Sequence, residues 1–344
     1  MTLTLCGGGN LGHVIAAFAA HRGYDVQLLT RHPERWNCDI SIDTPDGKVI
    51  TGRISRISNQ PSAVIPQADM VLLCLPGYAI GDCLTAIAPH LSSSTPVGSV
   101  VSSTGFFFEA LEKLPATTPL FGFQRVPFIA RTGEYGRSAH LLGYKPQLHV
   151  AYISRYEVRG ARCEDTQERS LFFRQLEQLF DTEVVPLGSH YEASLTNSNP
   201  LLHTSRLYSM WHTWHEGTVY PTQNRFYADW TDEASALLIA MDREFFQLLD
   251  VLPVRPGSIP TILDYYESCD APSLTRKLRS IPAFQDILSP MEAVAGGFVP
   301  DFHSRYFTED FPYGLAIVRR LMQEHAISAP HIEQVFLWGM SVCK

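Results

Sequence analysis

The sequence predicts an α/β chain in which a doubly wound parallel sheet is followed by a second, mainly α-helical domain. The first observation is that short apolar runs alternate with helical patterns over roughly the first half of the chain. Such alternation is typical of strand-helix-strand units that build a parallel sheet. The second observation is that strand signals nearly vanish after residue 189. The length of 344 residues also suits two domains.

The first domain, residues 1–189, is expected to contain all the strands of the sheet. Strands are predicted at 2–6, 25–30, 70–75, 97–101, 120–123 and 183–186, with helices at 11–22, 79–88, 106–113 and 163–180. A Leu-Gly-Ser break at 187–189 ends this domain. The second domain, residues 190–344, has helical periodicity at 199–213, 233–249 and 313–325.

Composition excludes several classes of protein. The chain has 35 acidic and 27 basic residues, a net charge of −8, which argues against a nucleic-acid partner. The longest apolar run, 70–75, is far too short to span a membrane, and no signal peptide precedes the first strand, so we expect a cytoplasmic protein. Seven cysteines without a C-x-x-C pair suggest neither a disulfide framework nor a zinc site, and no metal is expected.

Residues 7–12 read Gly-Gly-Gly-Asn-Leu-Gly, which is G-x-G-x-x-G between a predicted strand and a predicted helix. This is the dinucleotide-binding fingerprint of a Rossmann-type domain. Gly7 makes the tight turn, Gly9 lets the backbone approach the pyrophosphate, and Gly12 lets the helix pack closely on the strand. The amino end of the helix also favours an anion.

The end of the second strand indicates which dinucleotide binds. An NAD enzyme places an acid there, whereas this chain has Thr30 and Arg31, with Arg35 four residues on. Because a guanidinium attracts a 2′-phosphate, we favour NADP(H) over NAD(H), although both arginines also suit a solvated helix start. The residues expected to bind the cofactor are Gly7, Gly9, Asn10, Leu11, Gly12, Thr30, Arg31, Arg35, Leu75, Pro76 and Gly105.

The second domain contains a candidate acid. Asn199 and Pro200 read as a helix start, which puts His203 four residues on, on the same face as Asn199. Near a helix amino end an imidazolium needs a carboxylate partner. Residues 301–315 pack one arginine, two tyrosines and several acids into a stretch without clear periodicity, which is typical of a binding loop.

Five stretches together resemble the octopine/nopaline (opine) dehydrogenase family. They are the glycine loop at 7–12, Pro-x-x-His at 200–203, Phe-Tyr-Ala-Asp at 226–229, Asp-Arg-Glu at 242–244 and Arg-Tyr-x-x-Glu-Asp-x-Pro-x-Gly-Leu at 305–315. The resemblance implies a Rossmann domain and a helical domain with substrate between them. It also implies an enzyme that reductively condenses an amino acid with a 2-oxo acid, using NAD(P)H, and leaves both acids unidentified.

The resemblance assigns roles to particular residues. His203 matches the catalytic histidine of the family, Asp310 matches the aspartate paired with it, and Arg305 matches an arginine that contacts substrate carboxylate. Because the product carries two carboxylates, a second cation is wanted, and Arg131 is the next candidate. Asn199 is expected to bind substrate beside the histidine.

Three alternatives remain open from the sequence. Related two-domain dehydrogenases that reduce a small 2- or 3-oxo acid use a lysine, and none of the five lysines lies in the helix that begins near Asn199. A sensor that binds NADP without turnover is the second alternative. The third is a metal enzyme, although His203, His212 and His215 lack zinc-motif spacing with nearby carboxylates. The apolar stretch 335–340 is expected to be buried in its own domain or in a homodimer.

Overall fold

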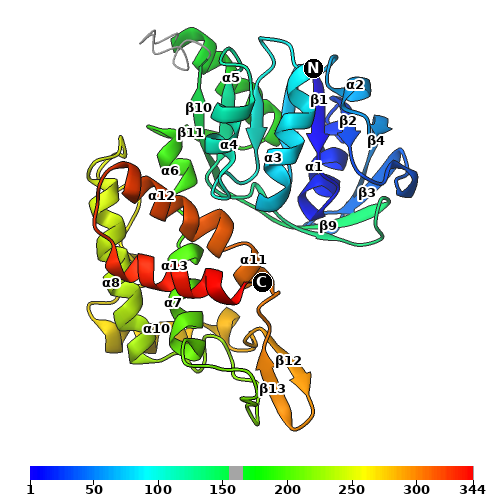
Figure 1. Ribbon diagram of the computed structural model, residues 1–344. Coiled ribbons are helices and arrows are strands. Elements are labelled where there is room, and N and C mark those ends of the chain that lie inside the picture. The colour runs from blue at the N-terminus through cyan, green and yellow to red at the C-terminus, as the bar shows by residue number, and fades with distance from the viewer. Residues whose placement is uncertain (155–165, 344) are drawn as a thin grey trace. The chain divides into compact units, whose positions relative to one another are not determined.

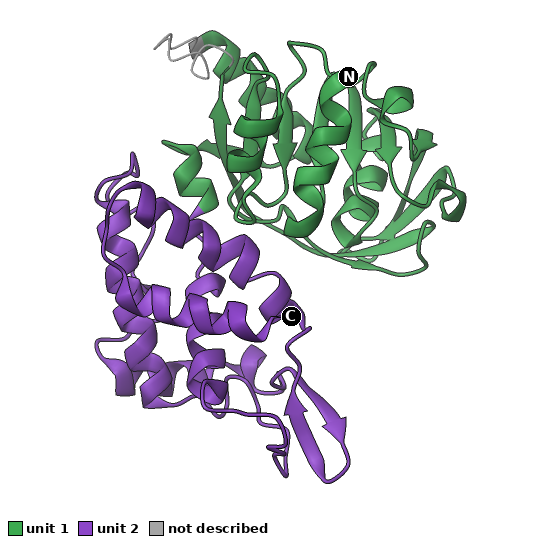
Figure 2. Cartoon of the chain, in the orientation of Figure 1, with its two compact units in different colours: residues 1–194 green, residues 195–344 purple. Residues whose placement is uncertain are grey.

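The computed structural model describes residues 1–154 and 166–343. The chain divides into two compact units, residues 1–194 and 195–344, which are coloured separately in Figure 2. Unit 1 holds a large sheet with helices on both faces, and unit 2 is mainly helical (Figure 1). The predicted fold class, an α/β domain followed by a helical one, is confirmed. Within the described residues, no helix is long and apolar enough to cross a membrane.

Within the described residues, the sheet of unit 1 has eleven strands, and the six central ones run parallel. In spatial order the strands are β11 (Glu183–Pro186), β10 (Gln147–Ile153), β7 (Leu120–Phe123), β6 (Val97–Ser99), β5 (Met70–Leu73), β1 (Thr2–Cys6), β2 (Asp25–Leu29), β4 (Val49–Ser58), β3 (Asp39–Asp43), β9 (Ser138–Tyr144) and β8 (Phe128–Thr132). The chain order reverses on either side of β1, which lies between β2 and β5. In such sheets ligands bind at the carboxyl ends of the strands that flank the reversal.

Helices cover both faces of the sheet because its central strands are apolar on both sides. On β5, Met70 and Leu72 belong to one buried cluster, and Val71 and Leu73 belong to the other. The first cluster includes residues of α1 (Asn10–His21) and α5 (Thr166–Phe180), and the second includes residues of α2 (Pro61–Val64), α3 (Gly77–Ile87), α4 (Phe106–Lys113) and α6 (His190–Ser194). An apolar run used on both faces is typical of a buried parallel strand.

The sheet is wider than the sequence predicts. Strands β3, β4, β8, β9 and β10 are missing from the prediction. Along β4 and β9 buried and exposed residues are mixed, so these strands lack the continuous apolar run that marks β5. Several of the additional pairings are antiparallel: β10 with β7, β3 with β4, and β8 with β9. The helix predicted at 163–180 is described from Thr166, and its first three residues lie outside the described part of the chain.

Unit 2 is a bundle with one projecting hairpin. Its elements are α7 (Asn199–Trp211), α8 (Asp232–Leu249), α9 (Ile262–Tyr265), α10 (Ala271–Ser280), the hairpin β12 (Met291–Val294) and β13 (Gly297–Pro300), α11 (Arg305–Thr308), the π-helical turn η4 (Phe311–Leu315), α12 (Ala316–Glu324) and α13 (Pro330–Val342). The helix predicted at 313–325 is therefore two elements, η4 and α12. Helix α13, which the sequence analysis does not predict, buries Ile332 and Val335 completely within this unit.

Candidate active site

Close backbone contacts hold the glycine loop between β1 and α1. Gly7 has a φ of +116°, and a Cβ there would lie 2.5 Å from the carbonyl oxygen of Cys74. A Cβ at Gly12 would lie 2.1 Å from the carbonyl oxygen of Gly7, so both positions require glycine. A Cβ at Gly9, in contrast, would meet no atom within 4 Å. This part of the loop therefore faces open space.

A cavity of about 750 Å³ opens beside this loop, at the carboxyl ends of β1, β2 and β5. Of the residues expected to bind a dinucleotide, Gly7, Gly9, Thr30, Arg31, Leu75 and Pro76 line it. Thr30 is buried and Arg31 is exposed at the end of β2, where no acid stands. The size is that of a small-molecule site, and the open space at Gly9 leaves room for a pyrophosphate beside the loop amides. These residues fit a dinucleotide.

The remaining predicted cofactor residues are Asn10, Leu11, Gly12, Arg35 and Gly105. They do not line the cavity. The Asn10 side-chain oxygen accepts hydrogen bonds from the backbone N–H and the hydroxyl of Thr132, at 2.9 and 2.8 Å. The Arg35 guanidinium lies 4.4 Å from the ring centre of Tyr135. Gly105, with a φ of +89°, precedes α4. Asn10 therefore holds the loop to β8.

His13 is a buried residue of this site that the sequence analysis missed. Its Nδ1 is 2.9 Å from the carbonyl oxygen of Gly9, and its Nε2 accepts a hydrogen bond of 2.7 Å from the backbone N–H of Gly136. The ring stacks on Trp36 at 4.1 Å. Burial lowers the pKa of His13, which favours the neutral ring that these two contacts require. The sequence feature that could have indicated this residue is its position directly after the glycine fingerprint.

In unit 2, the two ring nitrogens of His203 have different partners. Nδ1 lies 2.8 Å from Oδ2 of Asp310, and Nε2 lies 2.9 Å from the hydroxyl oxygen of Tyr227. The side chains of His203 and Asp310 are only 12% and 17% exposed. In the neutral ring, Nδ1–H donates to the carboxylate, so Nε2 accepts from the tyrosine hydroxyl. This is an oriented imidazole with a carboxylate behind it, suited to acid and base chemistry.

Helix packing brings the two residues together. His203 lies in the second turn of α7, and Pro200 lies in the first turn of the same helix. Asp310 directly precedes η4. A Cβ at Gly314 would lie 2.6 Å from Cγ of Pro200. Glycine at 314 therefore allows η4 to approach α7 closely enough for the carboxylate to reach the imidazole. The Pro-x-x-His and Asp-x-Pro-x-Gly patterns thus have a common steric reason.

Tyr227 is the second residue that the sequence analysis missed, although it lies in the 226–229 stretch of the resemblance. It is 5% exposed, and its ring lies among the rings of Phe226, Trp230 and Phe284. Burial raises the pKa of its hydroxyl, and the neighbouring Tyr306 raises it further. Tyr227 therefore keeps its proton. A tyrosine within an aromatic run carries no sequence signal of a contact with His203.

The predicted substrate residues lie in both units. Arg305 is exposed at the start of α11, and its guanidinium makes no hydrogen bond or ion pair with the described residues. Asn199 is the half-buried first residue of α7. Arg131 is exposed on β8 of unit 1. Arg305 is thus a cation five residues from Asp310 that remains available to a carboxylate.

Acids of the 242–244 stretch hold helices rather than substrate. The Asp242 carboxylate accepts a 3.0 Å hydrogen bond from the N–H of Ile262, and burial raises its pKa to about 6. The Glu244 carboxylate accepts from the N–H groups of His331 and Ile332, at 3.0 and 2.9 Å. It therefore caps the amino end of α13.

The histidines considered as metal ligands have other contacts. Nδ1 of His212 is 2.9 Å from the carbonyl oxygen of Tyr208, and His215 lies beside the Thr218 hydroxyl. Among residues 1–154 and 166–343, no group of three His, Cys, Asp or Glu side chains is arranged to hold a metal ion.

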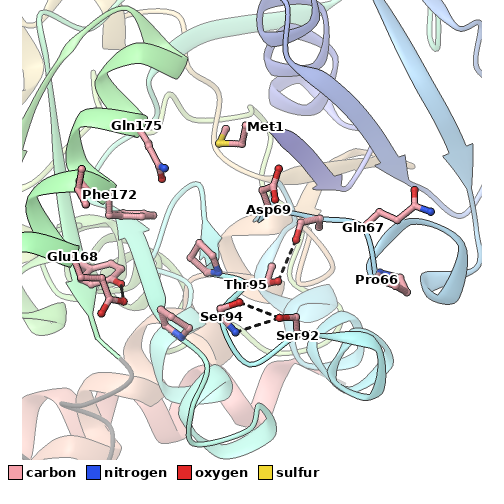
Figure 3. A pocket seen from close by; sticks show the side chains of 15 residues that line it. Met1, Pro66, Gln67, Asp69, Ser92, Ser94, Thr95, Glu168, Phe172 and Gln175 are labelled. Carbon is pink, nitrogen blue, oxygen red and sulfur yellow. Dashed lines mark hydrogen bonds between the residues drawn. The ribbon is translucent and has the colours of Figure 1, made fainter.

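A second cavity, of about 600 Å³, lies at the opposite edge of the sheet, beside the amino ends of β1, β5 and β6. Figure 3 shows Met1, Asp69, Thr95 and Glu168 among its lining side chains. The Asp69 carboxylate accepts a 2.7 Å hydrogen bond from the backbone N–H of Thr2. None of the predicted site residues lines this cavity.

Two family models match the chain. Residues 3–115 match the model described as ketopantoate reductase PanE/ApbA. Residues 186–343 match the model described as NAD/NADP octopine/nopaline dehydrogenase, alpha-helical domain. The second match contains His203, Asp310 and Arg305.

Individual relatives cover almost the whole chain. Octopine dehydrogenase of Pecten maximus is 26% identical over 97% of this chain and 88% of its own length. Tauropine dehydrogenase of Arabella iricolor is 27% identical over 99% of this chain and 91% of its own length.

Solved structures share the fold. Octopine dehydrogenase with NADH and L-arginine aligns with a TM-score of 0.83 at 24% identity, covering 99% of this chain and 89% of its own. Yersinopine dehydrogenase with bound NADP⁺ aligns with a TM-score of 0.70 at 12% identity, covering 99% and 90%.

Proposed function

The chain belongs to the opine dehydrogenase family of NAD(P)-dependent oxidoreductases, as its motifs predict, and we propose that it reductively condenses an amino acid with a 2-oxo acid. The observation that carries this proposal is the hydrogen bond between His203 and Asp310. The glycine-loop cavity of unit 1 supports it. The octopine dehydrogenase structures contain NADH with L-arginine or with pyruvate, so these two compounds are the first substrates to test.

The reaction needs an acid near neutral pH. An amine and a 2-oxo acid lose water to form an imine, and the imine carbon accepts hydride more readily when its nitrogen is protonated. His203, held by Asp310, supplies that proton and recovers it in the oxidative direction. The glycine loop would hold the pyrophosphate of the reduced dinucleotide, and the cofactor would supply the hydride.

Substrate carboxylates need cations. Arg305 is our first candidate because its guanidinium is exposed, unpaired among the described residues, and close in sequence to Asp310. A guanidinium binds a carboxylate through two parallel hydrogen bonds, which also orients it. Arg131 is the second candidate and Asn199 the polar neighbour at the start of α7.

The cofactor proposed is NADP(H) in preference to NAD(H). Arg31 lines the cavity at the end of β2, where an acid would stand in an NAD enzyme. Arg35 is offered as a weaker contact because its guanidinium already lies over Tyr135.

One screen tests the proposed function. The protein is incubated with NADPH or NADH and with amino acids paired against pyruvate, 2-oxoglutarate and oxaloacetate. We expect absorbance at 340 nm to fall only when both acids are present, and mass spectrometry to show a product that joins them. Cofactor oxidation with an oxo acid alone, giving a hydroxy acid, would instead indicate a carbonyl-reducing dehydrogenase. No oxidation with any pair would contradict the proposal.

A further inference from the structure

We propose that the hydroxyl group of Tyr227 relays the proton between Nε2 of His203 and the substrate, an inference that rests on the proposed function. In this structure Nε2, the ring nitrogen on the side away from Asp310, is already bound by that hydroxyl at 2.9 Å. Nδ1 is bound to the carboxylate at 2.8 Å. A proton that leaves the imidazole toward substrate therefore meets the tyrosine oxygen first.

The tyrosine ring is held too firmly to move aside. It stacks on Phe284 with ring centres 4.1 Å apart and an angle of 19°, and lies nearly parallel to Trp230 at 5.9 Å. Only 5% of Tyr227 is exposed. Swinging the ring out would break these contacts and leave a void among packed aromatic rings.

The backbone of this segment is fixed as well. Arg206, buried on α7, donates to the carbonyl oxygens of Phe226 and Asp229 at 3.0 and 2.7 Å. The N–H of Trp230 donates to the carbonyl oxygen of Tyr227 at 3.1 Å. The tyrosine is thus anchored to the same helix that carries His203, which keeps hydroxyl and imidazole in register.

The proton count balances without any other group. In the reductive direction, Nε2–H of the imidazolium transfers its proton to the phenol oxygen, whose own O–H bond breaks as its proton passes to substrate. The phenol is neutral before and after, Asp310 remains a carboxylate, and the imidazole becomes neutral. The oxidative direction is the reverse. Since burial and Tyr306 raise the pKa of Tyr227, the phenol keeps the proton that it must pass on.

Removing the hydroxyl and keeping the ring tests the relay. We expect Tyr227→Phe to lower kcat about 10- to 100-fold, below the largest effects of a lost acid because water partly replaces the hydroxyl. Michaelis constants and cofactor affinity should stay within about twofold. The matched control is Tyr208→Phe, which removes a tyrosine hydroxyl carried by α7 itself, where it accepts a 2.6 Å hydrogen bond from the side-chain amide of Gln334 on α13. It should leave kcat unchanged, and melting temperatures identify any loss of folding in either variant.

A proton inventory gives a signature that a merely structural role would not produce. Single-turnover rates are measured in mixtures of H₂O and D₂O, so that product release does not contribute. Two protons moving in one step give a curved dependence in the wild-type enzyme, and Tyr227→Phe should give a straight line. If the variant does not fold, the wild-type curve alone decides.

Several outcomes would overturn the relay while leaving the proposed function intact. The first is a Tyr227→Phe enzyme whose kcat is within twofold of the wild-type value. The second is a Tyr227→Phe enzyme in which only the Michaelis constant changes. The third is a linear dependence of the wild-type rate on the D₂O fraction. Absence of turnover in the wild-type enzyme with every substrate pair would instead overturn the proposed function, and the relay with it.

Discussion

Oδ2 of Asp310 lies 2.8 Å from Nδ1 of His203, although 107 residues separate them in the sequence. The histidine belongs to α7 and the aspartate precedes η4, and the two elements meet where Gly314 faces Pro200. The pair is therefore assembled entirely by packing within unit 2. Its chemistry can be probed separately from cofactor binding, which is predicted at the glycine loop of unit 1.

Cofactor preference is predicted from Arg31. NADPH should bind at least tenfold more tightly than NADH, a difference of about 1.4 kcal/mol, and Arg31→Glu should reverse the order because it replaces attraction by repulsion. Isothermal titration of both cofactors checks this. Arg53→Glu, at an exposed arginine paired with Asp39, serves as the control for a charge change elsewhere in unit 1. Equal dissociation constants for the two cofactors in the wild-type protein would contradict the prediction.

The glycine loop offers a matched pair of substitutions. Gly9→Ala places a methyl group in open space, so melting temperature should be unchanged while cofactor affinity falls at least tenfold, because the pyrophosphate needs that space. Gly12→Ala places a methyl group 2.1 Å from the carbonyl oxygen of Gly7 and should lower the melting temperature as well. Thermal unfolding with and without NADPH separates the two effects. If the Gly9→Ala variant binds NADPH as tightly as the wild-type protein, the pyrophosphate does not bind beside Gly9.

The sequence predicts the central strands well and the outer ones poorly, for a physical reason. Residues 70–73 are buried on both faces and therefore read as a continuous apolar run. On β9 only Ala139 and Leu141 are buried, His140 stands between them and the apolar Leu142 is exposed, so the periodicity of apolar residues is weak. Helix α13 is hidden differently, because Phe336 to Met340 form an apolar stretch without clear amphipathic spacing.

At the site, the local motifs and the pairing of His203 with Asp310 could be recognised from the sequence, but the other contacts could not. The glycine loop is contained in six consecutive residues, so its place was predictable. The contact of Nε2 of His203 with Tyr227 depends on the loop around residue 226, which Arg206 of α7 holds by a hydrogen bond to the carbonyl oxygen of Phe226. No sequence spacing between residues 203 and 227 predicts this contact. His13 was missed because its partner, Gly136, is 123 residues away.

Substrate anchoring is predicted for Arg305. Arg305→Ala should raise the Michaelis constant of one co-substrate about tenfold or more and leave cofactor affinity unchanged, since it removes a two-pronged contact with a carboxylate. Lysine should restore part of the loss because it keeps the charge without the fork. Arg276→Ala, at an exposed arginine of α10, is the control. Unchanged Michaelis constants for every acid tested would place Arg305 outside the site.

Stability should depend on pH through His190. This ring packs against Phe107 and Tyr191, and burial lowers its pKa to about 4. An unfolded histidine binds its proton near pH 6.5, so the free energy of unfolding should fall as pH drops from about 6.5 toward 4, by about 3 kcal/mol. The free energy of unfolding of the His190→Phe variant should fall correspondingly less over this pH interval. Urea unfolding of both proteins at pH 7 and 4.5 measures the difference, and equal losses would disprove the assignment.

The dyad is predicted to set both the rate and its pH dependence. His203→Ala should lower turnover about 10²- to 10⁴-fold, the usual contribution of one positioned acid, without changing NADPH affinity. Because the imidazolium is the acid, reductive turnover should hold at low pH and fall as pH rises, and oxidative turnover should show the opposite limb. Stopped-flow rates across pH 5 to 9 in both directions test this. If the His203→Ala variant turns over at the wild-type rate, His203 is not the acid and another residue must donate the proton.

Asp310 is predicted to act through the histidine, by orienting its ring. Asp310→Asn removes the charge that faces Nδ1 of His203, so turnover should fall, but by less than after the loss of His203 itself. The double variant His203→Ala with Asp310→Asn should be hardly slower than His203→Ala alone, because residues that act as one unit are not additive. If the double variant instead shows the full product of the two single losses, the carboxylate contributes to catalysis independently of the imidazole, and the hydrogen bond between them is structural.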